Sequence, residues 1–120
     1  MVLVKPGVSF SAIAPAGFRI LSALESVSRR LGISLTITSA CDGEHSGPGD
    51  PHHRGEAYDV RSHGVNAKDT VLLAVMRELG EPQPESGGFV TRCFFGWIEN
   101  AGSDNEHFHF QLRHGAEYTE

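Results

Sequence analysis

Histidines and carboxylates gather in two separate stretches of the chain. Of the seven histidines, four lie between residues 45 and 63 and three between residues 107 and 114, each group with acidic residues nearby. Imidazole nitrogens and carboxylate oxygens are the donors that Zn²⁺ takes in proteins. Two such clusters from distant parts of the chain therefore predict one metal site that is completed by folding.

A catalytic zinc site uses three protein ligands and keeps one position open for water. His52 stands at the end of an expected loop and Asp59 on the strand that follows, so both can converge on one ion. His109 can reach the same ion from a neighbouring strand. His53 is adjacent to His52 and competes with it as a ligand. The residues thus predict a site of two histidines and one aspartate.

A metal-dependent hydrolase also needs a general base, and Glu106 is the candidate, three residues before His109. Strict strand alternation would place Glu106 on the sheet face opposite His109. The polar run over residues 101–105 suggests that Glu106 lies in a turn, before regular strand geometry begins. We therefore expect its carboxylate near the metal.

The two segments read H-x-x-G-x-A-x-D and, later in the chain, E-x-x-H. This pair resembles the zinc peptidases of the D-alanyl-D-alanine carboxypeptidase group. The group includes vancomycin-resistance dipeptidases and endolysin-like phage L-alanyl-D-glutamate endopeptidases, and hedgehog signalling domains have a related fold. Thr38-Ser39-Ala40 also resembles the strand end that leads into the family's loop. The matching positions are His52, Gly55, Ala57, Asp59, Glu106 and His109.

The resemblance implies that His52, Asp59 and His109 bind one Zn²⁺ and that Glu106 is the base. Its spacing favours His52 over His53 as the ligand. It also implies a hedgehog/DD-peptidase fold and substrates drawn from the stem peptides of bacterial peptidoglycan, often with a D-residue beside the scissile bond. The scissile bond itself, and the choice between carboxypeptidase and endopeptidase, stay open.

The chain departs from the family pattern at two places. The family commonly has an Arg after the Thr-Ser strand end, where this chain has Asp42 and Glu44, and a Ser where this chain has Asp50. Loss of one oxyanion donor can lower the rate by roughly 10²–10³-fold. Arg61 can substitute, because it lies two residues after Asp59 and shares its strand face.

Other polar residues are candidates for substrate contact. His107 shares a strand face with His109, so it either touches the substrate or supports the ligands. His45 and Arg54 are further candidates for the substrate or the oxyanion. His63 and His114 are expected at the surface.

Three functions compete on this evidence. The leading prediction is a zinc peptidase of cell-wall peptides. The second is a non-catalytic, zinc-containing binding module of the same fold, which the missing Arg favours and Glu106 disfavours. The third is a non-haem Fe(II) oxygenase, which also uses two histidines and a carboxylate. Its first His and carboxylate usually stand two residues apart on an all-β double sheet, unlike His52 and Asp59.

The elements that would position these residues form an α+β fold, with two helices packed on a small, mostly antiparallel sheet. Pro15 and Gly32 bound the first helix, whose apolar positions are Phe18, Leu21, Leu24, Val27 and Leu31. Asn66 is expected to cap the second helix. Phe94, Phe95 and Trp97 are expected in the core. The expected segments are helix 15–31, strand 33–39, loop 40–54, strand 55–61, helix 66–79, connection 81–87, strand 88–98, turn 99–105 and strand 107–112.

Composition limits the remaining possibilities. A length of 120 residues fits one domain over residues 1–120, and a net charge of −5 argues against nucleic-acid binding. No apolar run approaches the roughly 20 residues of a membrane span, and residues 1–10 do not resemble a signal peptide. A cytoplasmic monomer is expected, with export or phage-type release needed for action at the wall. Cys41 and Cys93 are expected as reduced thiols, with a disulfide between them as the alternative.

Overall fold

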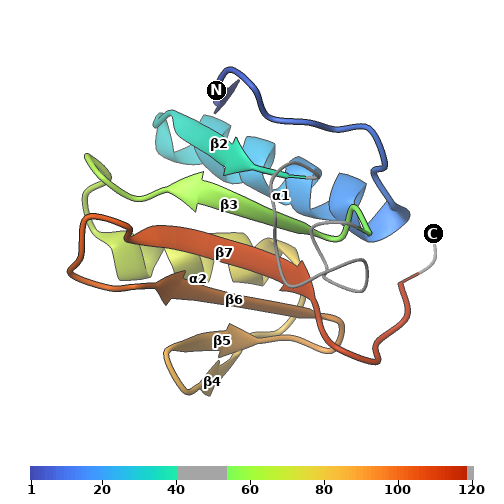
Figure 1. The fold of residues 1–120 in the computed structure, drawn as a ribbon. Helices are drawn as coiled ribbons and strands as arrows, with labels where there is room; N and C mark the ends of the chain where they lie inside the picture. Colours follow the sequence, from blue (N-terminus) through green and yellow to red (C-terminus); the bar gives the residue numbers. More distant parts are fainter. Residues whose placement is uncertain (41–53, 119–120) are drawn as a thin grey trace.

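Two helices cover one face of a seven-stranded sheet in the computed structural model, which describes residues 1–40 and 54–118 (Figure 1). The other face of the sheet carries no helix among these residues. The elements in chain order are β1 (Val2–Val4), α1 (Pro15–Leu31), β2 (Leu35–Ser39), β3 (Ala57–Arg61), α2 (Lys68–Glu78), β4 (Gln83–Glu85), β5 (Gly88–Val90), β6 (Phe94–Glu99) and β7 (His107–Leu112).

The strands are arranged in the order β1-β2-β3-β7-β6-β5-β4. Strand β1 runs parallel to β2, and every other neighbouring pair is antiparallel. The central pair joins β3 and β7, which are far apart in sequence, with Asp59 directly opposite His109. The expected mostly antiparallel α+β fold with two helices is therefore confirmed at this level. The finer hedgehog/DD-peptidase fold remains a prediction.

Alternation along the central strands separates the core from the candidate site. In β3, Tyr58 and Val60 are fully buried, and in β7 the same is true of Phe108. Side chains on the helix-covered face thus fill the core, and the residues between them point to the open face. Asp59 and His109 are two of these intervening residues, so the sequence places both on the open face.

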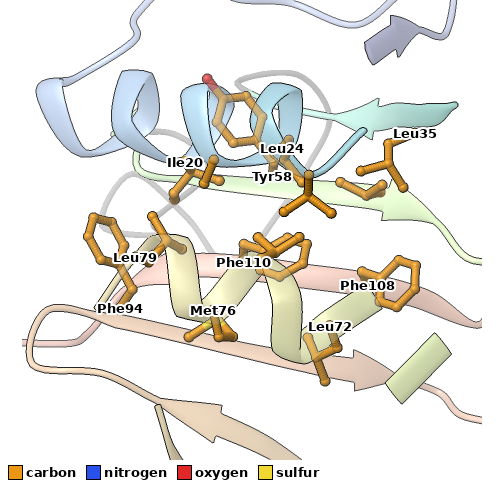
Figure 2. Packing of buried hydrophobic residues seen from close by; sticks show 14 of the residues in the cluster. Ile20, Leu24, Leu35, Tyr58, Leu72, Met76, Leu79, Phe94, Phe108 and Phe110 are labelled. Carbon is orange, nitrogen blue, oxygen red and sulfur yellow. The ribbon is translucent and has the colours of Figure 1, made fainter. Parts of the chain in front are cut away.

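The core lies between the two helices and the sheet, as Figure 2 shows for its larger members. Its apolar side chains come from α1, α2 and all the central strands. The labelled members are Ile20, Leu24, Leu35, Tyr58, Leu72, Met76, Leu79, Phe94, Phe108 and Phe110.

Helix α1 has the predicted bounds but buries a different face. Pro15 stands at its first turn, and Gly32 ends it with a left-handed φ of 65°. Leu24 and Val27 are buried as expected, whereas Phe18 is 56% exposed and Leu31 42% exposed. Helical spacing of the apolar residues therefore did not identify the buried face of α1.

Helix α2 is shorter than expected and begins differently. Its N-cap is Ala67, with φ 51°, and no side chain caps the helix, so the role expected for Asn66 was wrong. The predicted inward residues of this helix are all buried, namely Val71, Leu72, Val75 and Leu79.

The strand predicted over residues 88–98 is two antiparallel strands, β5 and β6. Thr91 makes the turn between them, because its N–H donates to the Phe94 carbonyl at 2.8 Å and its hydroxyl accepts from the Phe94 N–H at 3.0 Å. Residues 83–85, expected within a connection, form β4, and β1 was not expected at all. None of the helices in the described ranges is long and apolar enough to cross a membrane.

Candidate metal centre

Gly55 fixes the approach of the chain to strand β3. It has a φ of +71°, and a Cβ there would lie 2.7 Å from the Ala12 carbonyl carbon and 2.8 Å from the Ala14 nitrogen. Its own carbonyl accepts the Ala14 N–H at 3.1 Å, one residue before α1. The positive φ and the closeness of these backbone atoms both require a residue without a side chain at this position. The glycine of the first motif thus ties the start of α1 to the strand that carries Asp59.

Asp59 and His109 meet across the central strand pair. The Asp59 Oδ1 lies 2.8 Å from the His109 Nδ1, and the other imidazole nitrogen, Nε2, lies 2.9 Å from the Gln111 Oε1. His109 is only 7% exposed. Two of the three predicted ligands, fifty residues apart, are therefore brought into direct contact.

Glu99 and His107 join this pair from β6 and β7. The His107 Nε2 lies 2.9 Å from the Glu99 Oε2 and 3.6 Å from the Asp59 Oδ1, and the His109 Nδ1 lies 3.9 Å from the Glu99 Oε2. One ligand atom from each of the four residues lies within 4.8 Å of all the others. Glu99 was expected in a turn, but it ends β6 opposite His107. The register of β6 against β7 would have placed Glu99 beside His107, but the sequence alone does not give that register.

The spacing of these four donors fits a single ion. With bonds of about 2.0 Å, tetrahedral donors lie roughly 3.3 Å apart. Four of the six separations between these donors run from 2.8 to 3.9 Å and bracket this value, and all six are within 4.8 Å. Asp59, Glu99, His107 and His109 can therefore hold one metal ion.

Several predicted site residues lie outside the described ranges. These are the third predicted ligand, His52, its rival His53, the candidate substrate contact His45, and Asp42, Glu44, Asp50 and Cys41. Their predicted roles stay predictions.

Glu106 makes a separate network at the beginning of α2. Its Oε1 accepts from the Lys68 ammonium at 2.5 Å and the Ser62 hydroxyl at 2.7 Å, and its Oε2 accepts from the Gly102 N–H at 2.9 Å. These donors, Lys68 first, lower the pKa of Glu106 from its ordinary 4.5 to about 2. Glu106 is not among the four clustered donors. A carboxylate stabilised in this way is a weak base.

The predicted arginines lie at opposite ends of β3. Arg61 is exposed at its end, paired in register with His107, and so stands beside the four-residue cluster. Arg54 precedes the strand and forms an ion pair with Glu56 at 2.9 Å. His63 and His114 are exposed, as expected.

Aromatic side chains border the cluster on the open face. The Trp97 ring lies 4.3 Å from the His109 ring, tilted by 35°, and Phe95 packs edge-on against Trp97 at 4.9 Å. Only Phe94 of the three expected core aromatics belongs to the core; the prediction for Phe95 and Trp97 was wrong. These two help to line a hollow of about 420 Å³, together with Ser86, Gln111 and His114.

Comparison with protein-family models, with curated proteins and with solved structures gave no match. The family resemblance therefore depends on the sequence alone.

Proposed function

We propose that this protein is a zinc peptidase that hydrolyses peptide bonds in the stem peptides of bacterial peptidoglycan. The observation that carries the proposal is the 2.8 Å approach of Asp59 to His109 on adjacent strands. Each residue comes from one of the two motifs that resemble the zinc peptidases. The motifs were matched in sequence alone, so their meeting in space is independent support.

The residues on the open face suit the steps of such a reaction. A zinc ion held by His52, Asp59 and His109 would acidify a bound water and polarise the scissile carbonyl. Arg61, beside this centre, would bind the developing oxyanion or a substrate carboxylate. The hollow over Phe95 and Trp97 offers an apolar surface to the neighbouring part of the peptide.

A second candidate is a zinc-containing binding module without turnover, and the contacts of Glu106 favour it. For this carboxylate to accept a proton, its ion pair with Lys68 must first open. Its pKa of about 2 also makes it a poor acceptor at neutral pH. The Fe(II) oxygenase has less support, because the described chain forms one sheet covered by helices rather than a double sheet.

Digestion of purified muropeptides, followed by mass spectrometry, tests the proposal. We expect new fragments with free amines, their loss with a chelator, and their recovery with added Zn²⁺. Asp59→Asn should abolish cleavage, whereas Glu56→Gln, three residues earlier in the chain, should not. Metal bound to the wild-type protein with no fragment formed would refute the peptidase and support the binding module. Purification with iron in place of zinc would instead support the oxygenase.

A further inference from the structure

We infer that Glu99 and His107 are metal ligands, so that one ion is held by four side chains, those of Asp59, Glu99, His107 and His109. The donors come from β3, β6 and β7 only. Glu99 is absent from the two motifs, and His107 was expected either to contact substrate or to support the ligands. Both assignments come from the hydrogen bonds around the cluster.

The surroundings of His109 leave its Nδ1 as the donor atom. Its Nε2 faces the Oε1 of Gln111 at 2.9 Å, and the Gln111 Nε2 donates in turn to the Leu112 carbonyl at 3.2 Å. The amide oxygen is thus directed at the imidazole, and the Nε2 proton donates to it. Such a contact fixes the tautomer of a metal-bound histidine. The lone pair of Nδ1 then points towards Asp59.

His107 has the same arrangement with the ring nitrogens exchanged. Its Nδ1 lies 2.7 Å from the Asn105 carbonyl oxygen, to which only a protonated nitrogen can donate. The lone pair is therefore on Nε2, which lies 2.9 Å from Glu99. A backbone carbonyl is a common partner of the second nitrogen of a metal-bound histidine.

Four electron-pair donors thus lie within 4.8 Å of one another. In the neutral histidines, Nδ1 of His109 and Nε2 of His107 each face a carboxylate oxygen within 3 Å. Acceptors at this distance repel unless a positive charge lies between them. A divalent cation satisfies all four donors at once and neutralises the two carboxylates. The alternative to a metal ion is one extra proton on each histidine, because an imidazolium can donate to the carboxylate that faces it.

Glu99 has a distinct position in this centre. Its side chain is 42% exposed, against 16% for Asp59 and 9% for His109. Four protein donors close a zinc site, whereas catalysis needs one position free. If the proposed peptidase function holds, His52 and water or substrate would also need positions on this ion, and Glu99, the most exposed of the four donors, would be the ligand displaced to make room. Metal binding by the four residues does not depend on that function.

Metal affinity tests the inference without any assay of activity. We would measure Zn²⁺ binding by competition with a chromophoric chelator, and Co²⁺ binding by its visible absorption, which reports the coordination number. Glu99→Gln and His107→Gln should each weaken binding at least about 100-fold, more than loss of a supporting residue does. Glu85→Gln and His114→Gln, at exposed positions outside the cluster, are the matched controls and should bind as the wild type.

A variant at position 52 separates this inference from the proposed function. His52→Ala should still bind one Co²⁺ per chain through the four donors. Loss of metal from His52→Ala, with wild-type affinity in the Glu99 and His107 variants, would overturn the inference. Failure of the wild type to bind Zn²⁺ would also overturn the inference, and protonated histidines would then explain the cluster. Metal binding without peptide hydrolysis would refute only the peptidase. Circular dichroism of the metal-free variants confirms that each is folded.

Discussion

Replacement of Gly55 by Ala tests whether the first motif has a structural role as well as a chemical one. An added Cβ would lie within 2.8 Å of the backbone of Ala12 and Ala14, and closest to the Ala12 carbonyl oxygen. Backbone atoms cannot rotate away as a side chain can. The segment before α1 would therefore have to move from β3, and the hydrogen bond from Ala14 to the Gly55 carbonyl would lengthen.

Two terms contribute to the expected loss of stability. A non-glycine residue in the left-handed region costs about 1–2 kcal/mol. Forcing extra volume into a well-packed place costs about 1–3 kcal/mol more. Gly55→Ala should therefore lower the free energy of unfolding by about 2–5 kcal/mol, a large part of the 5–15 kcal/mol typical of a domain.

Gly64 provides the matched control, because its φ is +81° but no atom lies within 4 Å of the position of a Cβ. Gly64→Ala should show the backbone term alone, about 1–2 kcal/mol. Urea unfolding of both variants gives the difference, which measures the close packing at Gly55. Equal losses in the two variants would refute the packing argument. Metal affinity should fall only in Gly55→Ala, since only there would the added Cβ meet backbone atoms and shift the chain that leads into β3.

Glu106 has a folded pKa of about 2 against 4.5 when unfolded, so its stabilising effect is complete above pH 4.5 and is lost as pH falls to 2. Melting temperatures of Glu106→Gln and wild type should accordingly differ at pH 7 and converge near pH 2. Trp97, the only tryptophan, packs on His109, so its fluorescence should change with one-site saturation by Zn²⁺, and a Trp97→Phe variant should give no signal. Phe108→Ala should cost about 3–5 kcal/mol in urea unfolding, whereas Phe18→Ala, at an exposed position, should cost much less.

The sequence predicted elements whose limits are set by local chemistry. Helix α1 begins at Pro15 and is ended by Gly32, and both signals act within a few residues of themselves. The buried face of α1 was harder to assign. Phe18 and Val27 belong to one series of apolar residues at helical spacing, but nine residues are two and a half helical turns, so the two point in opposite directions. Residues spaced every three positions move progressively around the helix axis, because one turn takes about 3.6 residues.

The site was predictable only as far as the motifs extend. The meeting of Asp59 with His109 was expected, whereas the place of Glu99 depends on the pairing of β6 with β7, which no local pattern states. The β5–β6 turn lacks Gly or Pro and depends on the Thr91 side chain, so the two strands were taken as one. Strict strand alternation placed Glu106 on the sheet face opposite His109. The contact of Glu106 with Lys68 at the start of α2 agrees with that direction better than with a position near the metal.

The seam between β3 and β7 is where the two halves of the chain meet. Long-range strand pairings of this kind form slowly, because the entropy cost of closing a long loop comes before any stabilising contact is made. An ion bound by Asp59 on one side of the seam and by His107 and His109 on the other would act as a reversible cross-link between the halves. Because it binds only the assembled pair, it would slow their separation and raise the melting temperature in proportion to the logarithm of its concentration above Kd.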